Sequence, residues 1–327
     1  MQNGVYNYVI TKTHGQNPQR KKENKMKKII SLILALATLV CAMFAFTSCG
    51  GDELYKAYGK QLDKVKAPTD AAETLTVAMS PDFAPMEFSY INGADSEIAG
   101  FDVLLANYLA KELGMKLEIK AMSFDACQIA IGTGTVDLAI SGFSWTADRA
   151  ENYLISNYYI AGDNETEQVL ITSKANEDKL KNASDYAGLK IGYQGASLQE
   201  LLVNETFAGI AGELVPYGDL GLATVALQEG KIDALAVAQG NGESIIANTN
   251  GTLAFSGFEF EVDPKYENNV VLLNKADAEL LAKVNAALDK ALANDYYTPW
   301  YEASLILAGS KSIDELGYDD EGNKITE

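Results

Sequence analysis

Two stretches of the chain alternate short apolar runs with helical patterns, and this alternation limits the possible folds most strongly. Because alternating strands and helices form parallel sheets that bind ligands at the carboxyl ends of their strands, each stretch predicts one α/β lobe. The first stretch predicts strands at 74–79, 117–122 and 136–140 and helices at 97–114 and 125–131. The second predicts strands at 189–193, 214–217 and 232–238 and helices from 198 and at 220–228. A late strand at 269–273 and a helix at 276–294 return the chain, so two crossover strands and an interlobe cleft are expected.

The first 49 residues have the composition of a secretory leader. Lys27 and Lys28 precede an apolar run at 29–46, and small residues surround Cys49. This ending resembles a lipobox, which implies that Cys49 is acylated and anchors the mature protein to the membrane. A transmembrane anchor is the alternative, because the run of 18 apolar residues could just span a bilayer. Residues 1–25 are interpreted as an upstream extension and 50–72 as a tether.

Charge and scarce residue types exclude several functions. Of 26 Lys and Arg and 45 Asp and Glu residues, the leader holds seven basic and one acidic, which leaves a net charge of −25 on the mature chain. Such a chain cannot form the basic face that binds phosphates, so nucleic acid is excluded as a partner. The only histidine, His14, lies in the leader, so Ser-His, Cys-His and His-based zinc sites are excluded. No metal or cofactor is expected, and the lone Cys127 should be buried.

The segment at 136–149 combines a buried strand with residue types that bind a carboxylate. Ser144 and Thr146 could cap a short helix, and Arg149 follows within the same turn. Arg149 is the only arginine after the leader, and a guanidinium is the side chain best suited to bidentate binding of an anion. A surface ion pair with Asp148 or Glu151 is the alternative.

Six short stretches resemble, in the same order, the signature of bacterial extracellular solute-binding proteins, family 3, which serve ABC importers of polar amino acids. The resemblance extends over 74–306 and includes 83–88, 100–103, 136–142, 146–149, 195–199 and 230–234. It implies a two-lobed type II periplasmic-binding-protein fold, monomeric, that closes on an amino acid and delivers it to a permease at the cell surface or in the periplasm. Lobe 1 would comprise 73–162 and 268–310, lobe 2 163–267, and a polar tail 311–327.

The same resemblance assigns the ligand-binding residues. Arg149 would bind the α-carboxylate, with Ser144 and the Gly142 backbone beside it. Ser197 would approach that carboxylate from lobe 2, at the start of a helix whose N-terminus favours an anion. Phe83 and Phe124 occupy the positions that sandwich the ligand's side chain.

Two positions depart from the family pattern. Ala238 stands where members usually have the aspartate that meets the ligand's α-ammonium, and a buried ammonium without a counter-charge is costly. Gln239, Asn241 and Asp82 are candidate replacements, or else the ligand's nitrogen is not a free amine. Ser80 stands where members that bind Lys, Arg or His often have an acid, so an uncharged ligand side chain is expected.

An enzyme and a sensor are the alternatives on this scaffold. A cyclohexadienyl dehydratase resembles this fold, but the chain offers no recognisable pair of carboxylates for acid–base catalysis. A sensor would need a membrane span or kinase after the binding lobes, and the chain ends in a polar segment. A binding protein without enzymatic activity is therefore expected.

Overall fold

The computed structural model describes residues 51–92, 95–159 and 166–325. The leader and Cys49 lie outside these residues. Within the described ranges, no helix has the length and apolar character needed to cross a bilayer.

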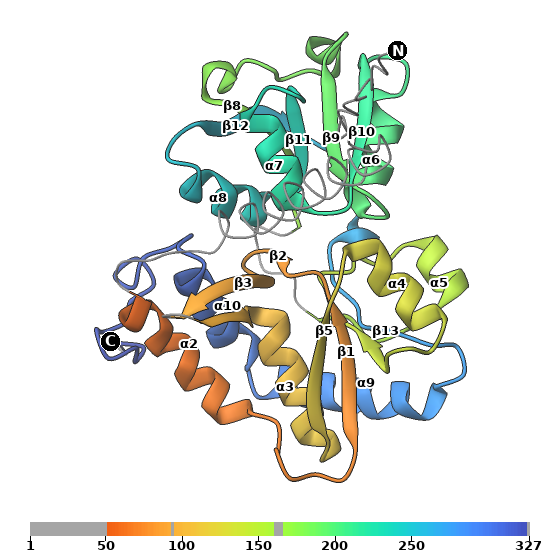
Figure 1. Ribbon diagram of the computed structural model, residues 1–327, viewed down its shortest axis with the longest axis vertical. Coiled ribbons are helices and arrows are strands. Elements are labelled where there is room, and N and C mark those ends of the chain that lie inside the picture. Colours follow the sequence, from red (N-terminus) through yellow and green to blue (C-terminus); the bar gives the residue numbers. More distant parts are fainter. Residues whose placement is uncertain (1–50, 93–94, 160–165, 326–327) are drawn as a thin grey trace, which may run out of the picture. The chain divides into compact units, whose positions relative to one another are not determined.

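Lobe 1 is built on a five-stranded sheet (Figure 1). Strand β1 (Thr74–Met79) is central to its parallel part, because it pairs in parallel with β5 (Lys116–Ala121) and β6 (Leu138–Ala139). The late strand β13 (Leu272–Leu273) pairs antiparallel with β6 and with β7 (Leu154–Ile155), so the returning chain completes the sheet. The helices of this lobe are α3 (Phe101–Leu113), α4 (Phe124–Gly132), α5 (Ala147–Asn152), α9 (Ala278–Ala293) and α10 (Tyr297–Leu307).

Lobe 2 is built on a second five-stranded sheet in the order β10-β9-β11-β8-β12. Strand β9 (Lys190–Gln194) is parallel to β10 (Glu213–Tyr217) and β11 (Ala234–Ala238), whereas β8 (Gln168–Ser173) is antiparallel to β11 and to β12 (Leu253–Glu259). The helices are α6 (Leu198–Phe207), α7 (Leu220–Gln228) and α8 (Gln239–Asn248), with short 3-10 turns at Lys174–Asn176, Ala183–Tyr186 and Pro264–Tyr266.

Two crossing segments join the lobes. The chain leaves lobe 1 after β7 and returns after β12, and the two segments meet where the Tyr159 N–H donates to the Asn269 carbonyl over 2.9 Å. Asn269 also bridges to Ser144. The expected α/β fold with two lobes and two crossover segments is confirmed, and Cys127 is buried as expected.

A small antiparallel sheet follows β1. Its strands are β2 (Asp82–Phe83), β3 (Glu87–Asn92) and β4 (Asp95–Ala99). Glu87 and Phe88 on β3 are buried, so this sheet places a carboxyl group inside lobe 1.

The tether expected at 50–72 is not a free linker over its first part, which forms helix α2 (Gly51–Val65). Its apolar residues recur at helical spacing, and Ala57, Tyr58 and Val65 are buried against α3 and α10 (Figure 1). The Tyr58 hydroxyl accepts from the Gly100 N–H over 3.0 Å and donates to the Gly100 carbonyl over 3.2 Å. Burial of one helix face, which a composition argument does not reveal, makes α2 part of lobe 1.

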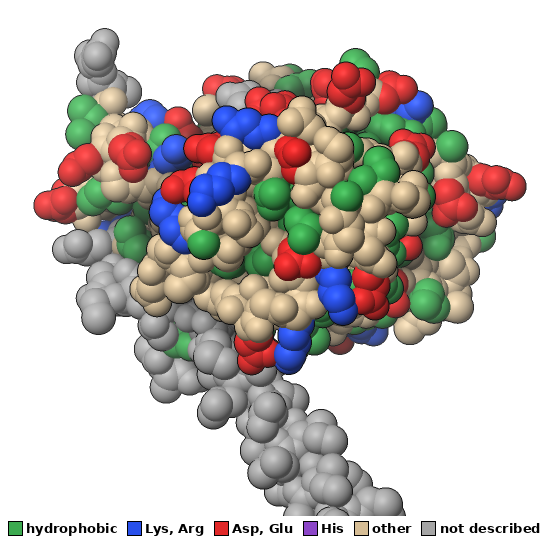
Figure 2. All heavy atoms as spheres, turned by 90° about the horizontal axis from the view of Figure 1, so that it is seen from above, with side chains coloured by type: hydrophobic (Ala, Val, Ile, Leu, Met, Phe, Trp, Pro, Cys, Tyr) green, Lys and Arg blue, Asp and Glu red, His purple; other side chains and the backbone are tan. Residues whose placement is uncertain are grey.

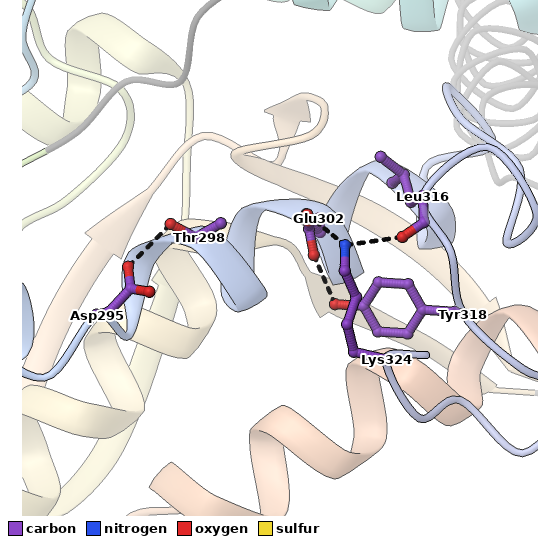
Figure 3. Close-up of polar contacts among 6 residues, drawn as sticks. All are labelled: Asp295, Thr298, Glu302, Leu316, Tyr318 and Lys324. Carbon is purple, nitrogen blue, oxygen red and sulfur yellow. Dashed lines mark hydrogen bonds and ion pairs between the residues drawn. The ribbon is translucent and has the colours of Figure 1, made fainter. Parts of the chain in front are cut away.

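The polar C-terminal segment also packs onto lobe 1. The buried Tyr318 donates its hydroxyl to Glu302 on α10 over 2.9 Å, and Lys324 forms an ion pair with Glu302 at 2.7 Å (Figure 3). Lys324 also donates to the Leu316 carbonyl over 2.8 Å. Polar composition predicted a tail, but one buried aromatic ring and a shared carboxylate hold the segment against the helix.

Candidate functional site

A small cavity lies between the lobes, where the loops after their strands meet. Both lobes and a crossing segment supply its lining. The lining residues are Phe83, Phe124, Ser141, Gly142, Ser144, Arg149, Gln168, Gln194, Ser197, Leu198, Gln199, Ala238 and Asn269. The six residues that the resemblance assigned to ligand binding are all among them, whereas the candidate replacements Gln239, Asn241 and Asp82 are not.

Among the described residues of this lining, Arg149 is the only charged one, and it is 3% exposed. Its backbone N–H is capped by Thr146 Oγ1 at 3.2 Å, which fixes the first turn of α5. The guanidinium donates to the carbonyls of Ser144 (2.6 Å) and Ala196 (2.8 Å) and to Gln128 Oε1 (3.3 Å). Burial lowers its pKa to about 10, so it stays charged at neutral pH.

The environment of Arg149 therefore favours an anion. All three of its side-chain acceptors are neutral oxygens, and its guanidinium carbon lies 5.5 Å from the centroid of Phe124 and 5.1 Å from that of Phe143. The alternative of a surface ion pair with Asp148 or Glu151 is wrong, since the side chain is buried and no ion pair joins it to a described residue.

Helix α6 points its N-terminus at the cavity from lobe 2. Ser197 caps the helix, because its Oγ accepts from the Glu200 N–H at 3.2 Å and donates to the Gln194 carbonyl at 2.6 Å. The first backbone N–H groups of a helix have no acceptor within the helix, and three consecutive residues of this end, Ser197 to Gln199, line the cavity. The backbone rather than the Ser197 hydroxyl is thus the donor that a carboxylate could use.

The two predicted aromatic residues lie on lobe 1 at the cavity. Phe124 begins α4 and packs on Phe143 at 4.6 Å between ring centroids. Phe83 lies on β2 and contacts the apolar cores of both lobes. Gly142 has a φ of +55°, and a Cβ there would come within 2.8 Å of the Phe83 ring. Glycine is therefore required at 142 by both the backbone and the ring.

The Gly142 N–H is not directed at the cavity, in contrast to the expectation for this position. It donates to Asp102 Oδ2 over 2.8 Å, and the same oxygen accepts from Tyr159 over 3.1 Å. Gly142 thus lines the cavity, while its N–H holds the turn onto the buried Asp102. The sequence around Gly142 could not predict this hydrogen bond, because its acceptor, Asp102, lies on α3, far away in the sequence.

Asp102 forms a buried acid pair with Glu87. Both residues are fully buried, and their carboxyl groups interact directly. Glu87 Oε1 accepts from Ser141 over 2.5 Å. Burial and the negative charge of Asp102 raise the pKa of Glu87 well above its usual range. A proton held between the two groups would give a partner to Glu87 Oε2 and Asp102 Oδ1, which have none among the described residues.

Asp82 connects the lobes. From lobe 1, its Oδ2 accepts from the Leu220 N–H at the start of α7 (2.8 Å) and from Gln194 Nε2 (2.9 Å), both in lobe 2. Its Oδ1 accepts from Ser80 over 2.8 Å. Burial, aided by the charge of Asp219, raises the pKa of Asp82 to about 7.

Four amide side chains of the lining were not predicted: Gln168, Gln194, Gln199 and Asn269. Gln199 Nε2 donates to Gln168 Oε1 over 2.6 Å. Gln168 pairs with Ala238 across the antiparallel strands β8 and β11. Only knowledge of this strand pairing could have placed Gln168 in the lining. The predicted Gln239 instead begins α8, outside the lining, and Asn241 donates to the Ala84 carbonyl over 3.1 Å. Within the described ranges, no cluster of three or more His, Cys, Asp or Glu could hold a metal ion.

On the face shown in Figure 2, acidic, lysine and hydrophobic side chains are interspersed. The lysines do not gather into a basic stripe on that face.

Known proteins resemble this chain in sequence and fold. The model of bacterial extracellular solute-binding proteins, family 3, matches residues 75–303. The L-cystine-binding protein TcyJ of Escherichia coli is 29% identical over 216 residues, which cover 66% of this chain and 76% of that protein. A probable histidine-binding protein of Campylobacter jejuni is 26% identical over 231 residues, covering 68% and 82%.

Among solved structures, the amino acid ABC transporter substrate-binding protein AbpA of Streptococcus pneumoniae, bound to L-arginine, superposes with a TM-score of 0.66. It is 29% identical, and the match covers 72% of this chain and 95% of that one. The family match spans well over half of the chain, includes both lobes and contains every residue that lines the cavity. The chain therefore belongs to the bacterial extracellular solute-binding proteins, family 3.

Proposed function

We propose that this protein is the substrate-binding component of an amino-acid ABC importer, and that it holds an amino acid or related carboxylate between its lobes. The observation that supports this most is the buried Arg149, which faces an interlobe cavity with neutral oxygens as its only side-chain acceptors. The ligand's carboxylate would replace the Ala196 carbonyl on the guanidinium and accept from the N-terminus of α6.

The space between the lobes also bears on how a ligand enters. Because both lobes supply the lining, a ligand would enter when the lobes separate. Asp82 is placed to stabilise closure, since it accepts two hydrogen bonds from lobe 2. Phe83 and Phe124 would then pack on the ligand's side chain.

The finer points of the proposal concern location and partners. Relatives are extracellular or periplasmic binding proteins, and the lipobox-like sequence supports acylation of Cys49 and retention at the membrane. Delivery to an ABC permease by a monomer would follow. Replacing Cys49 by Ala should release the protein from the membrane fraction, and an unlipidated native N-terminus elsewhere, seen by intact mass, would disprove the anchor.

Binding without catalysis is favoured over the dehydratase-like alternative. The relatives named above are binding proteins, and the lining contains no carboxylate among the described residues that could act as acid or base. The sensor alternative has no comparable support.

Calorimetry on Arg149 variants tests the function. Truncating one partner of a buried charge pair typically costs roughly 2 to 5 kcal/mol, so Arg149→Ala should weaken the best ligand by about 30-fold to several thousandfold. Arg149→Lys should recover little, because an ammonium lacks the planar fork. Lys179→Ala removes an exposed cation of lobe 2 and should leave affinity unchanged. Unchanged affinity in Arg149→Ala would refute the role of the guanidinium.

A further inference from the structure

The charge of the cavity lining limits the ligand that it can accept. Arg149 contributes one positive charge, and none of the other described lining residues is ionisable at neutral pH. A ligand with one negative charge would neutralise the closed site. A zwitterion would bring an ammonium as well and leave an uncompensated positive charge in an enclosed space, where solvation cannot offset it.

Amide groups occupy the region where a counter-charge for an ammonium is missing. Paired residues of neighbouring strands direct their side chains to the same face, so Gln168 lies beside the small side chain of Ala238. Gln168 is in turn joined to Gln199 from the start of α6 by a 2.6 Å hydrogen bond. This part of the wall therefore offers neutral donors and acceptors from two elements of lobe 2.

Asn269 adds a buried amide from the crossing segment. It is 5% exposed and lines the cavity, and its Nδ2 has no hydrogen-bond partner. Its backbone is fixed by the bridges to Ser144 and Tyr159. A buried amide donor without a partner is unfavourable, and an acceptor on a bound ligand would satisfy it.

Three acids of the described ranges that contact residues of the lining or of lobe 2 are engaged elsewhere. Asp82 faces lobe 2 and accepts from the start of α7 and from Gln194. Glu87 and Asp102 form the acid pair beneath the lining, where Asp102 accepts from Gly142 and Tyr159. None of the three lines the cavity, so none is placed to meet an ammonium there.

From these contacts we infer that the preferred ligand is a carboxylate whose α-nitrogen is acylated, as in an N-acyl amino acid or the C-terminal residue of an N-acylated short peptide. The inference rests on the proposed function, because Arg149 must bind the carboxylate. The ligand's amide N–H would donate to Gln168, and its acyl oxygen would accept from Asn269 Nδ2. The ligand's neutral amide would then form hydrogen bonds with neutral amide side chains, and its one negative charge would pair with the positive charge of Arg149.

Titration calorimetry with matched ligand pairs tests the inference on the complete mature chain. The probes are L-leucine, N-acetyl-L-leucine and N-acetylglycyl-L-leucine, with the same three forms of alanine and phenylalanine. In the parent protein, the acylated forms should bind at least as tightly as the free amino acid. The N-acetyl and glycyl arms distinguish acyl amino acids from peptides as the source of the ligand.

Variants of the cavity wall should reverse the preference for acylated ligands over free amino acids. Ala238→Asp and Asn269→Asp each add a carboxylate to the wall and should favour the free amino acid over its N-acetyl form by about tenfold or more. Two sites are used because Ala238 is buried and its variant could fail to fold. Asn269→Ala should weaken the N-acetyl forms by about fivefold and the free forms less. Asn204→Ala, an exposed amide on α6, is the matched control and should change neither.

Two outcomes would overturn the inference. If a free amino acid binds at least tenfold more tightly than its N-acetyl form, and Arg149→Ala abolishes that binding, the acylated-ligand inference is wrong while the proposed function stands. If no ligand of either form binds in a way that depends on Arg149, the proposed function fails and the inference fails with it.

Discussion

The buried acid pair predicts an unusual response to pH: the protein should become less stable as the pH rises above the ordinary pKa of a glutamate carboxyl group. Burial and Asp102 raise the pKa of Glu87 in the folded chain, whereas in the unfolded chain the group titrates in its ordinary range. Folding thus takes up a proton. Stability is fully present below the unfolded pKa and is lost as the pH rises toward the folded one.

The size of the effect follows from proton linkage. Where Glu87 is protonated in the folded chain and ionised in the unfolded chain, the one proton taken up on folding changes the free energy of unfolding by about 1.4 kcal/mol per pH unit. For a domain of this size, that corresponds to a fall in Tm of about 3 to 6 °C per pH unit. Histidine cannot contribute to this slope in the mature chain, because the only histidine, His14, precedes the expected leader cleavage site.

Glu87→Gln isolates the contribution of this proton. The Gln amide can donate to Asp102 and accept from Ser141, so the hydrogen bonds persist while the titration disappears. Urea unfolding at pH 6, 7 and 8 should show a slope about one proton shallower than that of the parent. Asp82 is present in both proteins and does not affect the difference. Glu118→Gln, at an exposed position, should keep the parent slope. Parallel slopes for parent and Glu87→Gln would refute the shared proton.

Three further predictions follow from other contacts. Calorimetry should show tighter binding of neutral ligand side chains than of arginine, although AbpA binds L-arginine, because no described lining residue offers a carboxylate; tighter binding of arginine would contradict this. Asp82→Ala should shift small-angle scattering of the ligand-bound protein toward an open form and weaken all ligands by about tenfold, since two interlobe hydrogen bonds are lost. Tyr58→Phe should lower the free energy of unfolding by about 1 to 3 kcal/mol, because the Gly100 N–H and carbonyl lose their partner; an unchanged urea midpoint would count against α2 being part of the lobe.

The hydrophobic periodicity of the sequence predicted the bounds of an element correctly where local signals, such as a helix cap, agreed with it. Helix α7 spans the predicted 220–228, because apolar residues recur at helical spacing after Asp219, which caps its N-terminus. Strand β6 is shorter than the predicted 136–140, since only Leu138 and Ala139 pair before the chain turns toward Ser141. The family and the two-lobed fold were predicted correctly from six motifs in order.

Features set by tertiary contacts could not be read from the sequence. Helix α10 is buried on most sides, and its aromatic residues, with Trp300 at 1% exposure, show no amphipathic pattern. For the site, the scarcity of arginine singled out Arg149, and the structure places it at the cavity. Gln168 and Asn269 could not be found in this way, because strand pairing in one case and the returning chain in the other bring them there.

The helical start of the described chain has a mechanical consequence for membrane attachment. If Cys49 is acylated as proposed, a single residue separates it from α2, whereas a flexible tether of about 20 residues would span roughly 25 Å on average. The lipid would thus be joined almost directly to lobe 1, through a helix that is packed into its core. Lobe 1 would stay close to the bilayer with restricted rotation, and lobe 2 would be the part free to swing. Encounters with a permease would then depend mainly on lateral diffusion in the membrane plane. The length of the linker would have little effect on the effective concentration of the protein at the permease.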